Sequence, residues 1–528
     1  MKVFFSRMSK NNPLLIFNFS VLVVAMIFAR LVFADTLGWG DAMNSMSRTV
    51  TPWEYIVEWY ENQNGRLSQA LLGSFVNSLL REYFSTPESF PWWLFRGIWL
   101  FAAISAPVNI VAILSKSFQF KEMQRTLFIV LLVWLLWSTS PIYYYTNAWF
   151  SSAEFLSYTG PVIFTSFFML FWMRLQSIQS TWIHWLVFSF SYIFLSLLNE
   201  HVMASLPVIT VGIAVAGLIR REKKSSYIVQ IIFVSFILSL IAISIHLTTP
   251  GQILRNSAIN AHVPDFSIQN IFNWYSGTVP YVYEYLLPQY IYKGSSVFKI
   301  IVVVVHTSLL GLLFFTAKRS YEKIKDKNVS LDLQEELSKD FTLSVLSMMF
   351  LLAYVAALGT QLVSRYWPGY SGIFPSLLVT FGLVLSGVLY VEILLRKIKG
   401  RYKSLDAGKI KVVLAVVLMI GVALVIVKNN IHEIKRTNLL VKENTRIRLA
   451  YYNKISEYHI KNKEVNFILK GCPYAVSYFG WSVEPEWGIS AYFRWLGFDD
   501  VFVVIDSNPD YKTRPLDKEY RSIDCSKL

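Results

Sequence analysis

Cysteine and charged residues are both scarce in this chain. Only 2 of its 528 residues are cysteine, too few for a cysteine-rich zinc or iron–sulfur site or for a disulfide-rich secreted module. Charged residues make up 16% of the chain, whereas soluble globular proteins carry about 25%. Hydrophobic residues reach 54%. This composition excludes an ordinary soluble enzyme and a disordered chain, and it predicts a membrane protein with many spans.

Long apolar runs with almost no charge mark the expected spans. A span needs about 20 such residues. Eleven runs meet this requirement: 14–34, 93–115, 127–143, 155–173, 181–199, 202–219, 226–247, 297–317, 341–361, 371–395 and 411–428. The first run is too long for a cleavable signal peptide, and no small-residue cleavage site follows it. We therefore expect an all-α polytopic membrane protein with about 11 transmembrane helices.

Positive charge is distributed unevenly among the connecting segments. With the N-terminus in the cytoplasm, the cytoplasmic segments hold 24 Lys and Arg residues. The opposite segments hold six, and they cover residues 35–92, 144–154, 200–201, 248–296 and 362–370. Because Lys and Arg accumulate in cytoplasmic loops, the net charge of +15 indicates topology and not a surface for nucleic acid.

The C-terminal part of the chain is more polar than the rest. Eleven spans give a transmembrane domain, 1–428, with long outer loops 35–92 and 248–296, and an extracytoplasmic domain, 429–528. The second domain is predicted to be a small α/β unit, with a charged helical stretch at 433–461, apolar runs at 465–469 and 501–505, and an amphipathic helix from Trp487 to Leu496. Cys472 and Cys525 both fall in this domain, where an oxidising compartment favours a disulfide; two unpaired thiols are the alternative.

The outer segments carry the unusual polar residues. The loop after the first span contains Asp35, Trp39, Asp41 and the tripeptide Asn64-Gly65-Arg66, and its apolar run from Leu67 to Leu80 suits a helix at the membrane surface. Further outer residues of this kind are Glu154, Asn199-Glu200-His201, Pro250-Gly251 with Arg255, and Arg365-Tyr366. A carboxylate or arginine at the lip of a span is costly in lipid and is therefore a candidate functional residue. Since all of them map to one side of the membrane, we expect one site there.

A reaction on a lipid-linked sugar at the membrane surface would need these residue types. Arg255 and Arg365 would hold a phosphate, because a guanidinium donates two hydrogen bonds to phosphate oxygens. A carboxylate in the first outer loop would act as general base toward an acceptor hydroxyl. Further carboxylates would stabilise an oxocarbenium-like transition state, and aromatic side chains would stack on the sugar rings.

Each of these residues also has a structural interpretation. The structural alternatives are helix caps for Asp35 and Asp41, buried ion pairs for Glu154 and Glu200, pairing with a nearby acid for Arg66, snorkelling to lipid headgroups for Arg255 and Arg365, and a core position for His201. Most of the Trp and Tyr residues suit an interfacial belt. The shared sidedness of the set, and not any single residue, therefore supports a functional site.

Four short motifs follow one another along the outer segments. They are Gly38-Trp39-Gly40-Asp41, Trp59 through Asn64-Gly65-Arg66, Pro250-Gly251-x-x-x-Arg255, and Arg365-Tyr366. In this order the sequence resembles the GT-C class of membrane glycosyltransferases, and more narrowly the serotype-converting O-antigen glucosyltransferases of bacteria and phages. The resemblance implies a multi-pass enzyme of the bacterial inner membrane with a periplasmic C-terminal domain. It also implies a polyprenyl-phosphate (undecaprenyl-phosphate) sugar donor, often of glucose, and a lipid-linked O-antigen acceptor.

The resemblance also suggests roles for the outer residues. The candidate catalytic residues are Asp41, as the base, with Glu154 and Glu200. The candidate residues for the donor phosphate are Arg66, Arg255 and Arg365. The candidate substrate-binding residues are Asp35, Trp39, Asn64, His201 and Tyr366. Many such enzymes carry two adjacent acids in the first outer loop, whereas Ala42 follows Asp41 here. This departure leaves open which acid is the base and whether a divalent metal takes part.

Three other functions fit parts of the pattern. An O-antigen polymerase would use outer arginines without a strong base in the first loop. A polysaccharide or lipid translocase would place ionisable residues near the middle of several spans, often with internal repeats, and no repeat is evident here. A head-group transferase would need an external metallohydrolase domain much larger than residues 429–528.

Overall fold

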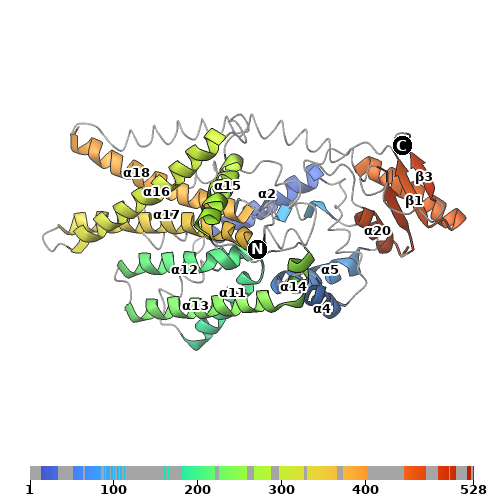
Figure 1. Cartoon of the computed structure of the whole chain (residues 1–528), viewed down its shortest axis with the longest axis horizontal. Coiled ribbons are helices and arrows are strands. Elements are labelled where there is room, and N and C mark those ends of the chain that lie inside the picture. Colours follow the sequence, from blue (N-terminus) through green and yellow to red (C-terminus); the bar gives the residue numbers. More distant parts are fainter. Residues whose placement is uncertain are drawn as a thin grey trace, which may run out of the picture.

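The computed structural model describes most of the apolar helices and most of the C-terminal unit. The described residues are 13–33, 51–62, 66–84, scattered positions between 89 and 168, 181–219, 225–258, 267–286, 296–325, 330–364, 373–401, 445–470, 486–498, 500–506, 520–524 and 527. Helices occupy most of this part of the chain, and a small sheet lies at one end of the molecule (Figure 1).

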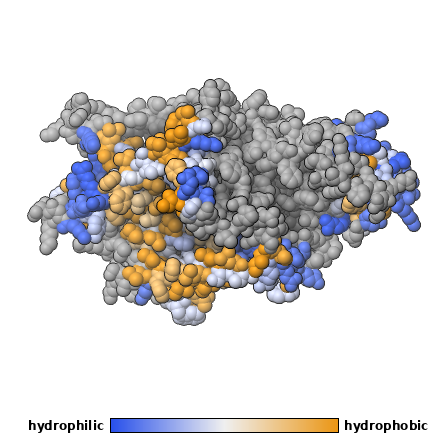
Figure 2. Space-filling model, in the orientation of Figure 1, coloured by the Kyte–Doolittle hydropathy of each residue, from blue (hydrophilic) through white to orange (hydrophobic). Residues whose placement is uncertain are grey.

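Four described helices are long and apolar enough to cross a membrane. They are the Val229–Thr248 part of α13 (Ser225–Thr248), α16 (Ser296–Lys325), the Leu331–Thr360 part of α17 (Leu331–Ser364) and the Leu377–Leu394 part of α18 (Ile373–Arg401). Shorter apolar stretches lie in α2 (Pro13–Phe33), α11 (Trp182–Ser196) and α12 (Glu200–Ile219). Figure 2 shows a broad hydrophobic surface on these helices, with hydrophilic residues beyond it. The chain is therefore a membrane protein.

The expected count of eleven spans is not reproduced. Seven predicted runs coincide with these seven helices, but only four of them have the length and composition of a span in the part of the chain that the structure describes. The run predicted at 181–199 is shorter than expected because α11 ends at Ser196, where the chain turns into α12. The runs at 127–143 and 411–428 lie outside the described residues, and those at 93–115 and 155–173 are described only at scattered positions.

Helix α17 lies at the centre of the bundle. It packs against α12, α16 and α18 along most of its length, and against α15 (Ile268–Leu286). Apolar side chains fill these contacts; the rings of Phe350 and Phe381, for example, stack with centroids 5.3 Å apart. Some polar groups inside the bundle bond across helices: the Tyr354 hydroxyl donates to the carbonyl of Val279 at 2.8 Å, and the Ser347 hydroxyl bonds to the carbonyl of Gly382. These bonds satisfy polar groups that lipid cannot hydrate.

The two ends of this bundle differ in the helix ends and charged residues that lie there. One end, here called the Arg396 end, contains the end of α16, the start of α17 and Arg396 of α18. There the Arg396 Nη2 atom lies 2.5 Å from Asp340 Oδ1 and 2.7 Å from Oδ2. The opposite end, here called the Glu200 end, contains the start of α12 and the end of α13. The Arg396 end is thus held by an ion pair between α17 and α18.

The C-terminal unit contains a three-stranded parallel sheet. Its strands β1 (Asn466–Lys470), β2 (Phe502–Ile505) and β3 (Arg521–Asp524) lie in the order β2-β1-β3. Helix α20 (Glu486–Trp495) and a helix at 445–462 accompany the sheet, and the rings of Tyr452 and Tyr492 stack 3.7 Å apart. The two predicted apolar runs form β1 and β2. Strand β3 was not predicted, because Arg521-Ser522-Ile523-Asp524 contains a single apolar residue.

Trp92 and the two cysteines were predicted from the sequence to lie at the membrane surface and in a disulfide, respectively. Trp92, expected among the interfacial aromatics, is instead buried in the core of the C-terminal unit, together with Tyr451 and Phe493. Cys472 and Cys525, the predicted disulfide pair, lie outside the described residues. Lys470 and Asp524 are partners in the β1–β3 register.

Gly382 provides a test of the packing between α17 and α18. A Cβ atom at this position would lie 2.5 Å from Leu351 Cγ and 3.2 Å from the Leu351 backbone nitrogen, closer than packed atoms allow. We expect Gly382→Ala to lower the free energy of unfolding by about 1–3 kcal/mol through overpacking. Gly387, on the same helix, has no atom within 4 Å of such a Cβ. Gly387→Ala should therefore stabilise by roughly 0.5–1 kcal/mol. Thermal unfolding in detergent measures both, and equal shifts would contradict the packing.

Candidate functional site

Three short helices gather at the Glu200 end of the bundle. They are α4 (Pro52–Asn62), α5 (Leu67–Tyr83) and α14 (Pro250–Ala258) (Figure 1). Helix α4 packs against α5 and α14, and α14 follows α13 directly after Thr249. The apolar run predicted as a surface helix at 67–80 thus forms α5. The two segments singled out by Asn64-Gly65-Arg66 and Pro250-Gly251 meet at one end of the bundle.

A capping box fixes the start of α4. The Thr51 backbone N–H donates to Glu54 Oε2 at 2.7 Å, and the Glu54 backbone N–H donates to the Thr51 hydroxyl at 3.3 Å. Pro52 occupies the first helical position, where its missing N–H costs nothing. The backbone hydrogen bond from Thr51 lowers the pKa of the exposed Glu54 carboxyl below its ordinary value. This local sequence therefore determines where α4 begins.

A second cap fixes the start of α12. After α11, the chain turns at Leu197 and Leu198, and the Asn199 side-chain oxygen accepts the backbone N–H of His201 at 2.8 Å. Asparagine is preferred at the residue before a helix, because its side-chain oxygen accepts a backbone N–H of the first turn that has no carbonyl partner within the helix. The cap makes Glu200 the first residue of the helix, where the helix dipole favours a negative charge.

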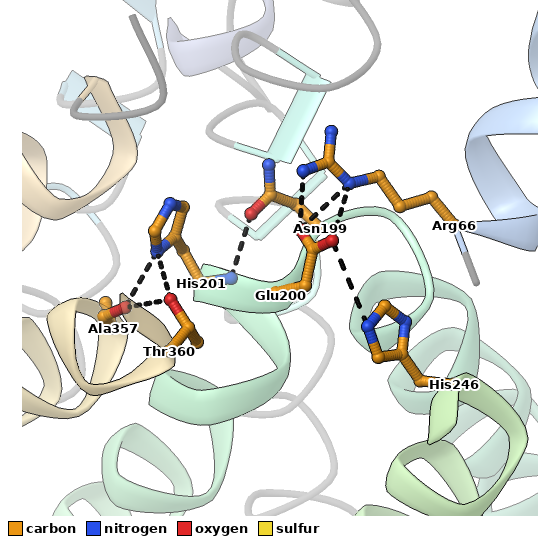
Figure 3. Close-up of polar contacts among 7 residues, drawn as sticks. All are labelled: Arg66, Asn199, Glu200, His201, His246, Ala357 and Thr360. Carbon is orange, nitrogen blue, oxygen red and sulfur yellow. Dashed lines mark hydrogen bonds and ion pairs between the residues drawn. The ribbon is translucent and has the colours of Figure 1, made fainter. Parts of the chain in front are cut away.

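Arg66 and Glu200 form a close ion pair at this end (Figure 3). Arg66 Nε lies 3.0 Å from Glu200 Oε1 and 2.8 Å from Oε2, and Arg66 Nη2 lies 2.7 Å from Oε2. The side chains are only 13% and 17% exposed. Charge-assisted bonds in such a partly buried place are strong. Both carboxylate oxygens are occupied by the guanidinium, so Glu200 does not accept an acceptor proton while the pair is intact.

His246, in the last turn of α13, lies on the other side of the carboxylate. Its Nε2 atom is 3.9 Å from Glu200 Oε1, and its side chain is 9% exposed. The sequence analysis did not identify His246, because it stood inside an apolar run. An ionisable residue near the end of a span was the signal that could have identified it.

His201 points away from this ion pair. Its Nδ1 atom donates to the carbonyl of Ala357 at 2.7 Å and lies 3.1 Å from the Thr360 hydroxyl, both on α17 (Figure 3). The imidazole therefore joins the start of α12 to the far part of α17. The substrate-binding role predicted for His201 has no support from these contacts, whereas its structural alternative fits them.

The other predicted site residues are described in part or lie outside the described residues. The backbone of Arg255 belongs to α14, next to α4, but its side chain lies outside the described part. Helix α17 ends at Ser364, one residue before Arg365. The predicted residues outside the described part are Asp35, Trp39, Asp41, Asn64, Glu154, Arg365 and Tyr366. Of the predicted set, the structure thus brings Arg66 and Glu200 together and places the helix that carries Arg255 close by.

No three His, Cys, Asp or Glu side chains gather into a metal site among the described residues. Glu200 has an arginine and a histidine as its neighbours, a set that suits an anion better than a metal ion. The acids for which a metal was considered, Asp35 and Asp41, lie outside this part of the chain.

No protein-family model matches the sequence, and no curated protein sequence matches it. Function therefore has to follow from the chain's own residues and their geometry.

The energy of the Arg66–Glu200 pair can be measured by unfolding. We expect Arg66→Met to lower the free energy of unfolding by about 3–5 kcal/mol, because it leaves a buried carboxylate without its guanidinium. The double variant Arg66→Met/Glu200→Gln should recover much of this loss, since no charge is left unpaired. Chemical unfolding of the purified protein in detergent tests both variants. As a control, Lys461→Met breaks an exposed pair with Glu457 and should leave the midpoint unchanged. A double variant less stable than Arg66→Met would contradict the assignment.

Proposed function

We propose that the chain is a membrane glycosyltransferase of the GT-C class. It would move a hexose, by preference glucose, from a polyprenyl phosphate to a lipid-linked O-antigen or similar surface glycan. The observation that carries the proposal is the Arg66–Glu200 pair at the end of the apolar helices, beside α14. Two segments that the resemblance singles out, 184 residues apart between Arg66 and Pro250, therefore meet where a lipid headgroup would lie.

The proposed orientation follows from the charges at the two ends. The Arg396 end carries Lys318, Arg319, Lys323, Lys325 and Lys397 on its helices. If this end faces the cytoplasm, the Glu200 end and α4, α5 and α14 face the periplasm, in accord with the distribution of basic residues in inner-membrane proteins. A cytoplasmic N-terminus and a periplasmic C-terminal domain are part of this proposal.

In the proposed reaction, the acceptor hydroxyl oxygen attacks the anomeric carbon of the donor. The new glycosidic bond forms as the bond from that carbon to the phosphate oxygen breaks, and the polyprenyl phosphate leaves. Asp41 takes the acceptor proton, while Arg255 and Arg365 stabilise the departing phosphate. Glu154 would lie near the sugar and oppose its positive charge. Glu200 holds Arg66 in the ligand-free site and is therefore a positioning residue.

A lipid or polysaccharide translocase is the second candidate, and His306 is the observation that favours it. This residue lies within α16 and is fully buried. Its ring centroid lies 6.3 Å from that of Tyr275 and 5.9 Å from that of Tyr354. An ionisable residue inside a span often belongs to a transport path. A translocase would move the lipid-linked sugar without forming a new glycosidic bond.

The proposal is tested by an assay of transfer in membranes. With a radiolabelled polyprenyl-phosphate sugar, we expect Asp41→Asn to lose about 100-fold or more of the rate, because general base catalysis contributes 10²–10⁴-fold. Arg255→Ala should lose about 10–100-fold through weaker stabilisation of the phosphate. Labelled glycan is the readout, so a translocase would give none.

A control variant separates chemistry from folding. Asp340→Asn weakens the Arg396 pair at the opposite end of the same bundle, so it should lower thermal stability while leaving the rate per folded molecule unchanged. Full activity in both Asp41→Asn and Arg255→Ala would refute the roles given to these residues. An unchanged surface polysaccharide after gene deletion would refute the pathway.

A further inference from the structure

We propose that His246 is a positioning residue that compensates the charge of Glu200 when Arg66 turns to the phosphate of the lipid ligand. The identity of that ligand rests on the proposed function. Binding of the phosphodiester would then exchange one anion for another at Arg66, and a proton would be taken up at His246.

The exchange follows from the atoms that form the ion pair. The Nε and Nη2 atoms of Arg66 make the fork that binds Glu200. A phosphate is recognised by the same kind of fork, with two parallel N–H donors on one edge of the guanidinium. Phosphate binding through this edge therefore competes directly with Glu200.

Loss of Arg66 as a partner would leave the Glu200 carboxylate unpaired. Its side chain is only 17% exposed, and an unpaired carboxylate in such surroundings is costly. His246 Nε2 lies 3.9 Å from the carboxylate on the side away from Arg66 (Figure 3). A protonated imidazole there would replace the charge of the guanidinium, and a modest movement would turn this contact into a hydrogen bond. Histidine suits this role because its charge changes near neutral pH.

The other ionisable groups around α13 do not offer this compensation. From α12, His201 bonds to Ala357 and Thr360 of α17 instead of facing Glu200. From α11, the Tyr192 hydroxyl bonds to Ser239 of α13 at 2.7 Å, two turns before His246. From α14, Arg255 has its side chain outside the described part. Glu200 is thus a carboxylate that His246 faces directly, with Arg66 on the opposite side of that carboxylate.

A binding experiment on the full chain in lipid nanodiscs tests the exchange. The probe is the methyl ester of a labelled undecaprenyl phosphate, a phosphodiester whose single negative charge does not change between pH 6 and pH 8. We expect the affinity of the natural chain to rise about tenfold from pH 8 to pH 6, because binding takes up a proton. His246→Gln should abolish this rise and bind about tenfold more weakly at pH 6. Glu200→Gln should bind tightly at both pH values, since no carboxylate competes.

Matched controls define the result. Asp340→Asn, at the Arg396 end, should keep the pH dependence of the natural chain. Undecaprenol, which lacks phosphate, should show no pH dependence, and dimethyl phosphate in solution distinguishes a free anion from a lipid headgroup as the ligand. Thermal unfolding verifies that each variant is folded; should His246→Gln fail to fold, Glu200→Gln alone decides.

The outcomes are distinct from those of the transfer assay. Retention of the natural pH dependence in either His246→Gln or Glu200→Gln overturns the exchange, even if transfer of sugar is observed. The expected binding pattern without any transfer would support a lipid-phosphate site and refute the glycosyltransferase. If the affinity for dimethyl phosphate depended on pH as strongly as the affinity for the lipid probe, the lipid headgroup would not be the ligand.

Discussion

The burial of charge at the end of an apolar helix is the constraint on which the arrangement of the site depends. Glu200 begins α12 beside lipid-facing helices, where an unpaired carboxylate would be costly. Arg66, which lies between α4 and α5, supplies the opposite charge at 2.7 Å. The pair therefore joins the segment of α4 and α5 to the bundle. Since α14 packs on α4, the same contact also determines where the segment carrying Arg255 lies.

Helix α17 connects the Glu200 end to the other helices of the bundle. Its contacts with neighbouring helices include hydrogen bonds at successive levels: Asp340 pairs with α18, Ser347 bonds to α18, Tyr354 bonds to α15, and Ala357 accepts the His201 imidazole of α12. Polar groups in apolar surroundings bind only where their partners are in register. The sliding of α12 along α17 would therefore break the bond between the His201 imidazole and the Ala357 carbonyl. Such a rigid support is what a site at the bundle end needs to hold Glu200 and His246 in place.

Much of the helical architecture, and less of the site, could be predicted from sequence. Apolar runs in the sequence identified seven described helices, because a helix in lipid must consist mostly of apolar residues. The start of α4 is also visible in the sequence, because the capping box Thr51-Pro52-Trp53-Glu54 is a local pattern. The pairing of Arg66 with Glu200 joins residues 134 positions apart, and no local pattern carries that information. The same limit explains β3, whose strand character comes from its neighbour β1, and His246, whose importance appears only once Glu200 lies beside it.

The charges at the two ends of the bundle favour different partners. At the Arg396 end, one guanidinium faces two carboxylates, those of Asp340 and Glu336, so the group has an excess of negative charge. At the Glu200 end, one carboxylate lies between a guanidinium and an imidazole, so that protonation of His246 gives an excess of positive charge. An anion close to Asp340 and Glu336 would be repelled by their carboxylates, whereas an anion close to Arg66 and a protonated His246 would be attracted. Under the proposed function, this local difference in charge favours the Arg66–Glu200–His246 group, and not the Asp340–Arg396 pair, as the place where a lipid phosphate would bind.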